Sequence, residues 1–249
     1  MLEQIQTGWP GVQAWCCDLD DPRALSACEE SVLDADELRR AERLRAERPR
    51  QRFIRRRTLR RFLLGQFLET SPATLCFAET GSGKPHLSEF SPERCGFSTS
   101  HSENVFMMAM AAEMEIGVDV EVLRPEWNLE SVAAMYLDRR QITQLESFPR
   151  QEQQRQFLRF WSLREAFAKA SGSGIAQSSA GQMSAASVWN CIFCAGSPRP
   201  EWNWIQQWHR IGKHDAIISV CHKRPDMQEY AAAQHMSGCW KSCRNARPI

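Results

Sequence analysis

Residues 160–174 read Phe-Trp-Ser-Leu-Arg-Glu-Ala-Phe-Ala-Lys-Ala-Ser-Gly-Ser-Gly, and this segment contains the most informative pattern in the chain. On a helix, Glu165 and Lys169 are four residues apart and share one face. Aromatic and small residues fill much of the rest, so the predicted helix is mostly apolar. An ordinary surface ion pair would explain the two charges by themselves, so their interpretation depends on the rest of the chain.

The start of this helix decides how Ser162 is interpreted. Ser162-Leu-Arg-Glu165 matches the capping-box pattern Ser-x-x-Glu, which would place Ser162 at a helix N-terminus. Apolar and aromatic residues such as Phe157 and Phe160 indicate that the helix begins earlier, near Gln151. Ser162 is then internal, and the capping box does not apply.

Composition predicts a soluble globular protein. Of the 249 residues, 43% are hydrophobic and 24% are charged, enough for one large domain or two small ones. No apolar run is long enough to predict a membrane span, and the first residues do not resemble a secretory signal. The ten cysteines are therefore expected to be reduced thiols of a cytoplasmic protein. The pair Cys191-Ile-Phe-Cys194 has no second CxxC, so a structural zinc site is not predicted.

Charge is distributed unevenly along the chain. The formal net charge is +1, but residues 39–61 contain twelve arginines against Glu42 and Glu47. That segment alone carries a charge of about +10, which leaves the remainder clearly acidic. Such a block indicates an anionic partner: a phosphate compound, a nucleic acid or an acidic protein.

The order of apolar periods predicts an α+β protein built from two similar halves. Strands are expected at residues 12–17, 75–78, 97–101, 105–112, 116–121, 187–194, 202–208 and 215–221. Helices are expected at residues 34–47, 50–69, 129–136, 139–147 and 151–171, with Pro49 separating the first two. The pattern of helices followed by strands occurs twice, which suggests an N-terminal half (1–112), a C-terminal half (113–231) and a flexible tail (232–249).

A second acidic pair changes the interpretation of the helix. Asp119 and Glu121 are two residues apart, so they share one side of a strand whose other side carries Val118 and Val120. The alternative is a solvated face of an edge strand, but the apolar side indicates a half-buried strand. Two carboxylates on one side suit Mg²⁺, which binds carboxylates together with substrate phosphates and waters. Glu165 can supply a third carboxylate.

Two short segments are interpreted as phosphate contacts. Gly81-Ser82-Gly83-Lys84-Pro85 is not a P-loop, because Ala78 replaces the first glycine and a proline replaces the Ser/Thr. What remains is a lysine at a tight turn, able to meet a phosphate. Ser100-His101-Ser102 lacks the surroundings of a hydrolase nucleophile, and a phosphate-contacting loop fits better.

These motifs together resemble those of the Sfp-type 4′-phosphopantetheinyl transferases. They are Gly83-Lys84-Pro85, Phe97-Ser-Thr-Ser-His101-Ser, Gly117-Val-Asp-Val-Glu121 and Trp161-Ser-Leu-Arg-Glu165-Ala-Phe-Ala-Lys169-Ala-Ser-Gly172. A looser match joins Arg40-Ala41, Arg52-Phe53 and Arg57-Thr-Leu-Arg-Arg-Phe-Leu-Leu64. The resemblance runs from about residue 36 to residue 174 and depends on the order of the motifs, since no single one would suffice.

The resemblance implies a fold, a reaction and partners. The fold would be a pseudo-twofold pair of similar α/β subdomains with coenzyme A bound between them. The enzyme would move the 4′-phosphopantetheine arm of coenzyme A to a serine of an apo acyl or peptidyl carrier protein, leaving 3′,5′-ADP. It would act as a cytoplasmic monomer, with no nucleic acid or membrane as partner.

The resemblance also implies a role for each site residue. Asp119, Glu121 and Glu165 would bind Mg²⁺ with the pyrophosphate, Glu165 would be the base for the carrier serine, and Lys169 would stabilise the charge on the pyrophosphate. The nucleotide phosphates would be held by Lys84, Ser100, His101, Arg40 and Thr58. Two positions depart from the family pattern: Arg164 stands in place of a lysine, and Ser98 in place of an asparagine, which leaves the support of the 97–102 segment open.

Two other classes of protein remain as alternatives. A nucleic-acid-binding protein could use the arginine block, but this reading leaves the acidic set without a role. A transferase-like protein without activity could bind carrier proteins only, against which the intact acidic set argues. The carrier itself could belong to fatty acid, polyketide or nonribosomal peptide synthesis, among which the sequence does not choose.

Overall fold

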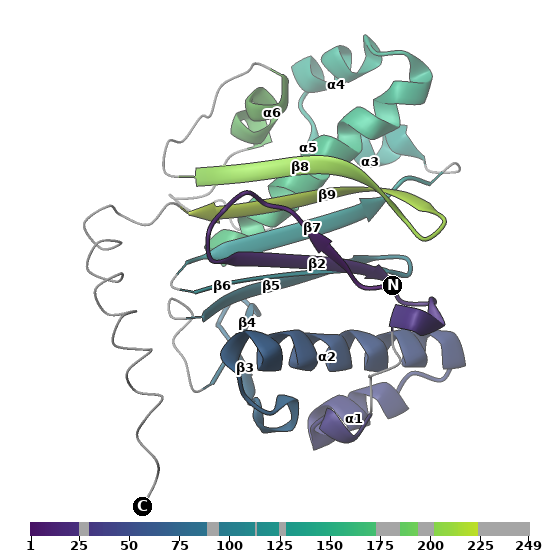
Figure 1. The fold of residues 1–249 in the computed structure, drawn as a ribbon. Coiled ribbons are helices and arrows are strands. Elements are labelled where there is room, and N and C mark those ends of the chain that lie inside the picture. The colour runs from purple at the N-terminus through teal and green to yellow at the C-terminus, as the bar shows by residue number, and fades with distance from the viewer. Residues whose placement is uncertain are drawn as a thin grey trace, which may run out of the picture.

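The computed structural model describes residues 1–24, 30–88, 95–112, 114–124, 128–172, 185–193 and 202–223 as a mixed α+β fold. Its strands are β1 (Glu3–Ile5), β2 (Val12–Asp18), β3 (Phe77–Glu79), β4 (Pro85–Leu87), β5 (Cys95–Ser102), β6 (Val105–Ala112), β7 (Ile116–Val122), β8 (Trp202–Ile211) and β9 (His214–Lys223). Its α-helices are α1 (Ala35–Glu42), α2 (Glu47–Leu68), α3 (Leu129–Tyr136), α4 (Arg139–Glu146), α5 (Arg150–Ser171) and α6 (Ala185–Phe193). Figure 1 shows α1 and α2 on one side of the strands and α3–α6 on the other.

Two antiparallel sheets occupy the middle of the molecule. One has the strand order β1-β2-β6-β5, the other has the order β7-β9-β8, and β3 pairs with β4 in a separate hairpin. The order repeats between the halves: β2-β6-β5 and β7-β9-β8 each place the last strand of the half between the first and the middle one. A long helix follows the first of these strands in both halves, α2 after β2 and α5 after β7.

Alternating side chains give each sheet two different faces. Met107 of β6 packs with Val118 and Val120 of β7 in a core between the sheets, and all three are fully buried. The opposite faces are covered by helices, with Leu63 of α2 in one cluster and Phe160 of α5 in another. Burying one such side chain is worth about 1.5–3 kcal/mol, so these cores hold both helices against the strands.

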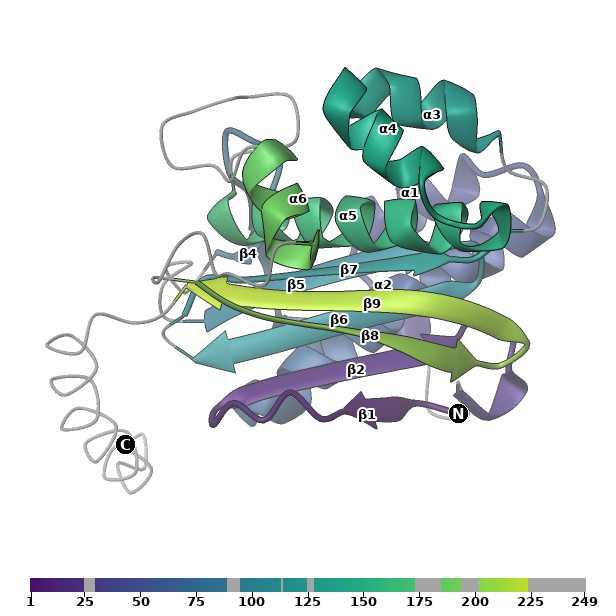
Figure 2. The ribbon, with the colours of Figure 1, turned by 90° about the horizontal axis from the view of Figure 1, so that it is seen from above.

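The absence of a side chain at Gly117 lets α5 lie directly on β7. A Cβ atom at Gly117 would stand 2.0 Å from the carbonyl oxygen of Ala166 and 2.4 Å from the amide nitrogen of Ala170. Figure 2 shows α5 running over β7 and the neighbouring strands. This close approach places Glu165 and Lys169 of α5 above the acidic side of β7.

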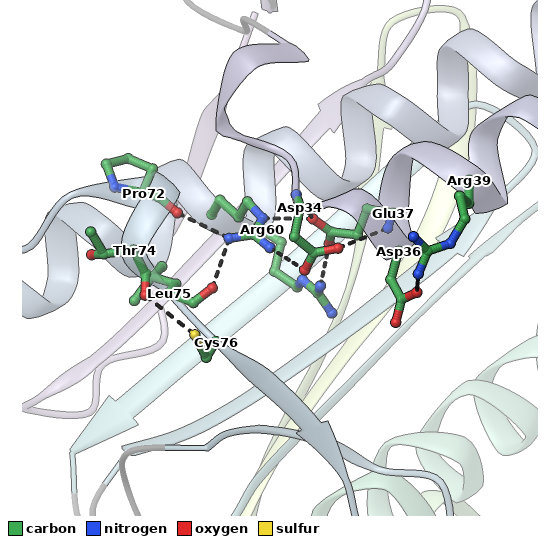
Figure 3. Close-up of polar contacts among 10 residues, drawn as sticks. Asp34, Asp36, Glu37, Arg39, Arg60, Pro72, Thr74, Leu75 and Cys76 are labelled. Carbon is green, nitrogen blue, oxygen red and sulfur yellow. Dashed lines mark hydrogen bonds and ion pairs between the residues drawn. The ribbon is translucent and has the colours of Figure 1, made fainter.

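Helices α1 and α2 are joined by a buried ionic network (Figure 3). The guanidinium of Arg61 is fully buried and donates to Glu37 Oε2, to Asp34 Oδ2 and to the carbonyl oxygen of Leu75. Arg60 donates to the other oxygen of Glu37 at 2.7 Å. Removing one partner of such a network leaves a buried charge uncompensated, so these two arginines serve the fold.

Most expected elements are confirmed within a few residues. The helix expected at 34–47 ends at Glu42, the short strands β1 and β4 were not expected, and three further details differ. The strand expected at 187–194 is wrong, because Ala185–Phe193 forms α6 with Val188 and Trp189 buried in the α5 cluster. Pro49 does not separate two helices: it lies in the first turn of α2, where its missing N–H needs no partner. Residues 100–102, interpreted as a phosphate-contacting loop, are the last residues of β5.

Several sequence expectations fall outside the described residues. The tail at 232–249, with Cys239 and Cys243, lies there, as does Cys194 of the CxxC pair.

Among the described helices, none is long and apolar enough to cross a bilayer. Helix α5 begins at Arg150, so Ser162 is internal as expected and no capping box forms.

Candidate active site

Three carboxylates meet in a cleft between β7 and α5. Asp119 and Glu121 lie on the side of β7 that faces α5, and Glu165 reaches the same cleft from α5. The cleft encloses about 530 Å³. Asp119 is only 3% exposed and Glu165 7% exposed, so the solvated edge-strand alternative is wrong for this side of β7.

Lys169 forms its ion pair across to the strand. Its ammonium Nζ lies 2.7 Å from Asp119 Oδ1 and 3.0 Å from Ser100 Oγ. The Ser100 hydroxyl donates to the same Asp119 oxygen at 2.8 Å. The charges of the 160–174 helix are therefore not an isolated surface pair, because Lys169 bonds to β7 and Glu165 is buried.

Burial makes the acidic cluster hard to ionise in the absence of a cation. It raises the pKa of Asp119 despite the opposing charge of Lys169. Burial, followed by repulsion from Asp119, raises the pKa of Glu121 and that of Glu165 to about 7 each. Asp119 Oδ2 and Glu165 Oε1 are also buried without a hydrogen-bond partner.

These residues fit a hard divalent cation in their chemistry. Within the described ranges, no set of three His, Cys, Asp or Glu side chains is already arranged as a metal cage. Mg²⁺ does not need one, because it takes one or two carboxylates and completes its shell with waters and substrate phosphates. The unpartnered oxygens of Asp119 and Glu165 are the hard donors that such an ion prefers.

The opposite wall of the cleft is basic. Arg56 and Arg57 of α2 line it, and His101 of β5 lies at the same opening. Burial, and then the charges of Arg57 and Arg52, lowers the pKa of Arg56 to about 10. The pKa of His101 is lowered to about 4, first by partial burial of the imidazole and then by the charges of Arg56, Lys169 and Arg57. Crowded cations of this kind would be relieved by a bound anion.

Lys84 lies beside the cleft, in the turn between β3 and β4. Its Nζ donates to the carbonyl oxygen of Ala170 at 2.8 Å, near the C-terminal end of α5. The turn is tight as expected, with Gly83 at φ +81. Lys84 also lines an adjoining hollow together with Glu165 and Lys169.

Two predicted residues do not reach the cleft. The side chain of Arg40 is exposed, and its guanidinium lies 3.8 Å from Glu79. Thr58 is fully buried inside α2. Neither lines the cleft, whereas Arg56 and Arg57, which directly precede Thr58 in α2, do.

Sequence reasoning missed Arg56, Arg57 and Trp161 among the residues that line the cleft. The indole of Trp161 lies 4.4 Å from the ring of Tyr136, centroid to centroid, and the guanidinium of Arg164 stands over both rings. The signal was available for the arginines, since positions 56, 57 and 60 share one side of a helix. It was obscured by the arginines on every other side.

Comparisons with known proteins indicate the family of the chain. The family described as the 4′-phosphopantetheinyl transferase superfamily matches residues 115–233, which include β7 and α5. The chain is 36% identical over 167 residues to the 4′-phosphopantetheinyl transferase HetI of Nostoc sp., a match that covers 67% of this chain and 70% of that protein. It is 32% identical over 166 residues to the putative 4′-phosphopantetheinyl transferase slr0495 of Synechocystis sp., covering 67% of each chain.

A shorter match of 32% identity over 90 residues covers 36% of this chain and 46% of the 4′-phosphopantetheinyl transferase AcpT of Salmonella typhimurium. The family match and the two longer alignments extend over most of the region that forms the acidic side of the cleft. On this evidence the chain belongs to the 4′-phosphopantetheinyl transferase superfamily.

Proposed function

We propose that this protein uses the cleft for a Mg²⁺-dependent transfer of the 4′-phosphopantetheine arm of coenzyme A to a serine of an apo acyl or peptidyl carrier protein. The products are the holo carrier protein and 3′,5′-ADP. The observation that supports this most is the meeting of Asp119, Glu121 and Glu165 with Lys169 in one cleft, opposite a wall of arginines. Phosphoryl transfer depends on alignment and charge neutralisation, which this arrangement can supply.

Asp119, Glu121 and Glu165 are the residues that would hold Mg²⁺. Bound there, the ion would neutralise charge on the pyrophosphate of coenzyme A. The raised pKa values of Glu121 and Glu165 and the unpartnered oxygens of the cluster support this assignment. Lys169 already pairs with Asp119 and points into the cleft, where its ammonium would stabilise the leaving 3′,5′-ADP.

Glu165 is the residue that would accept the proton of the carrier serine. A general base works best when its pKa lies near the working pH, and burial raises that of Glu165 to about 7. A bound cation lowers the basicity of any carboxylate it touches. Glu165 would therefore accept the serine proton on an oxygen that does not contact Mg²⁺. The other two carboxylates would supply the rest of the negative charge that the ion needs.

The phosphates of coenzyme A fit the basic wall. Arg56 and Arg57 replace Arg40 and Thr58 in this role, because they line the cleft. His101 and Lys84 stay in the proposed phosphate-binding set. Lowered pKa values at His101 and Arg56 support an anion there, since a bound phosphate would raise both pKa values again. The Ser100 hydroxyl is assigned to Asp119, to which it donates.

The fold that accompanies this function is a pseudo-twofold pair of halves, residues 1–112 and 113–231. The repeated strand order and the matching positions of α2 and α5 support it. We also expect a monomer that works in the cytoplasm, where coenzyme A and the carrier protein would meet it. Cys16, Cys95 and Cys221 are buried free thiols, as a reducing compartment would keep them.

Nucleic-acid binding is not favoured as a second function. Much of the arginine block is paired within the protein: Arg52 bonds Asp20, and Arg60 and Arg61 bond Glu37. Cations that are already neutralised contribute little to binding a phosphate backbone.

A single incubation tests the proposed function. An apo carrier protein is mixed with coenzyme A, MgCl₂ and this protein, and its mass is measured. A mass increase of one phosphopantetheine, abolished by EDTA and restored by Mg²⁺, is expected. Retardation of DNA in a gel without any gain of carrier mass would contradict the proposal.

A further inference from the structure

The two sheets meet along β5 and β7 without backbone pairing. β5 is an edge of the first sheet and β7 an edge of the second, so the described strands form no ladder between them. Serines occupy alternate positions of β5, and alternate residues of a strand point to the same side. Ser98, Ser100 and Ser102 are 5%, 7% and 5% exposed, and all three bond to β7; we call them the serine seam.

The seam takes the place of a backbone ladder. Ser98 Oγ accepts a hydrogen bond from the amide of Val118 at 3.1 Å. Ser102 Oγ accepts one from the amide of Val122 at 3.2 Å. A buried amide without a partner costs about 1–3 kcal/mol, so these hydroxyls stabilise the edge of β7 against β5.

The seam also orients the carboxylates. Ser102 Oγ donates to Glu121 Oε2 at 2.9 Å, and Ser100 Oγ donates to Asp119 Oδ1 at 2.8 Å. A hydroxyl has one hydrogen and two lone pairs, so Ser102 can accept from Val122 and donate to Glu121 at once. This double use connects the Glu121 carboxylate to the backbone one residue further along the same strand.

A simpler explanation is that small residues are needed where two sheets pack closely. The packing between the sheets is made by other residues, such as Met107 of β6 against Val118 of β7. Each seam serine instead has a specific polar partner on β7, and two of those partners are the acidic side chains of the site. Space filling does not account for this pairing.

We propose that Ser98 and Ser102 are positioning residues for the acidic cluster. Ser98 holds the backbone of β7, and Ser102 holds both the backbone and the Glu121 side chain. The structural part of this inference stands alone, and its consequence for Mg²⁺ rests on the proposed function. It also gives Ser98 a defined role, although this position departs from the family pattern.

Hydrogen exchange of the metal-free protein tests the structural part. Ser98→Ala should speed exchange of the Val118 amide about tenfold, and Ser102→Ala that of Val122, the scale of one lost hydrogen bond. Amides of β7 that bond to β9 should be unchanged in both variants. Exchange rates like those of the wild type at Val118 and Val122 would overturn the inference. If S102A does not fold, S102C, with a weakly bonding thiol, provides the same comparison.

Calorimetric titration of MgCl₂ into the coenzyme A complex, without carrier protein, tests the consequence. S102A should bind Mg²⁺ about tenfold more weakly, the scale of one bond to a charged group, and S98A less than threefold more weakly. Ser219→Ala is the matched control, because Ser219 is a buried strand serine whose hydroxyl bonds Ser162 and not a carboxylate. Equal losses in all three variants would refute a specific role for Ser102. A wild-type protein that binds no Mg²⁺ would instead refute the proposed function, while the exchange experiment would still decide the role of the seam.

Discussion

Asp119→Asn removes one negative charge from the cleft and keeps the size of the side chain. In the wild type, Ser100 and Lys169 both donate to Asp119 Oδ1. The amide oxygen of the variant can still accept both hydrogen bonds. What changes is the electrostatic field around Glu121 and Glu165. We expect the metal-free variant to be more stable than the wild type at pH 8 and to be inactive in transfer.

The size of the effect follows from the two glutamates. Each has its pKa raised from 4.5 to about 7, and repulsion from Asp119 is the second cause after burial. A shift of this size corresponds to about 3 kcal/mol, an upper limit that screening by solvent reduces. If repulsion from Asp119 accounts for a third of this free energy, its removal stabilises the native state by about 1 kcal/mol per glutamate. The loss of the Lys169 ion pair, whose ammonium is partly exposed, costs about 1 kcal/mol.

The net gain is therefore about 1 kcal/mol, or roughly 2–4 °C in Tm for a chain of this size. The sign depends on pH in a defined way. A carboxyl whose pKa is raised by folding holds its proton more tightly in the native state, so metal-free wild type loses stability as pH rises from 4.5 to about 7. The variant should lose less over that window, and the two proteins should converge below it.

Thermal unfolding in EDTA at pH 5, 6, 7 and 8 measures this difference, and carrier modification followed by mass spectrometry measures transfer. Added Mg²⁺ should stabilise the wild type more than the variant, because binding to the native state shifts the unfolding equilibrium. A variant that is less stable than the wild type at pH 8 in EDTA would show that the Lys169 pair outweighs carboxylate repulsion, and the reasoning would fail.

Further substitutions probe other parts of the site. Glu165→Gln should slow transfer at least about a hundredfold, with partial rescue at higher pH, because it removes the base but keeps a ligating oxygen; rates at three pH values measure this. Arg56→Ala and Arg57→Ala should each weaken coenzyme A binding about tenfold or more in calorimetry, whereas Arg40→Ala, outside the cleft, should change it little. Gly117→Ala should destabilise the fold by more than about 3 kcal/mol in urea, since the new Cβ meets the backbone of α5 and not a movable side chain. Wild-type stability of this last variant would mean that α5 and β7 are not in direct contact.

The acidic side of the site could be predicted because its signals are local. The alternation of Val118, Asp119, Val120 and Glu121 requires only the period of a strand, and Glu165 requires only a helix with an apolar face. Both elements formed where the pattern indicated. The basic side could not be predicted, because it depends on which face of α2 turns toward the cleft. Arginines lie all around this helix, so the sequence did not distinguish Arg56 and Arg57 from their neighbours.

Contacts between distant strands were beyond the reach of the sequence. The serine seam exists because the edges of two sheets come together, and no local period of β5 indicates what lies opposite. Helix α6 shows a different limit: the apolar run at 187–194 fits a buried strand or a short helix equally well. In the structure this run is a helix, and the ring of Trp189 packs against the ring of Phe160 of α5 with 5.5 Å between their centroids. This tertiary contact favours the helix and could not be read from the local pattern.

The contact at Gly117 has a mechanical consequence. Because the backbone of α5 lies directly on β7 at this point, the helix cannot move closer to the strand, and the contact sets the spacing between Glu165 and the two carboxylates of β7. The Lys84 side chain adds a second tie near the C-terminal end of the same helix, where it links the turn between β3 and β4 to the carbonyl oxygen of Ala170.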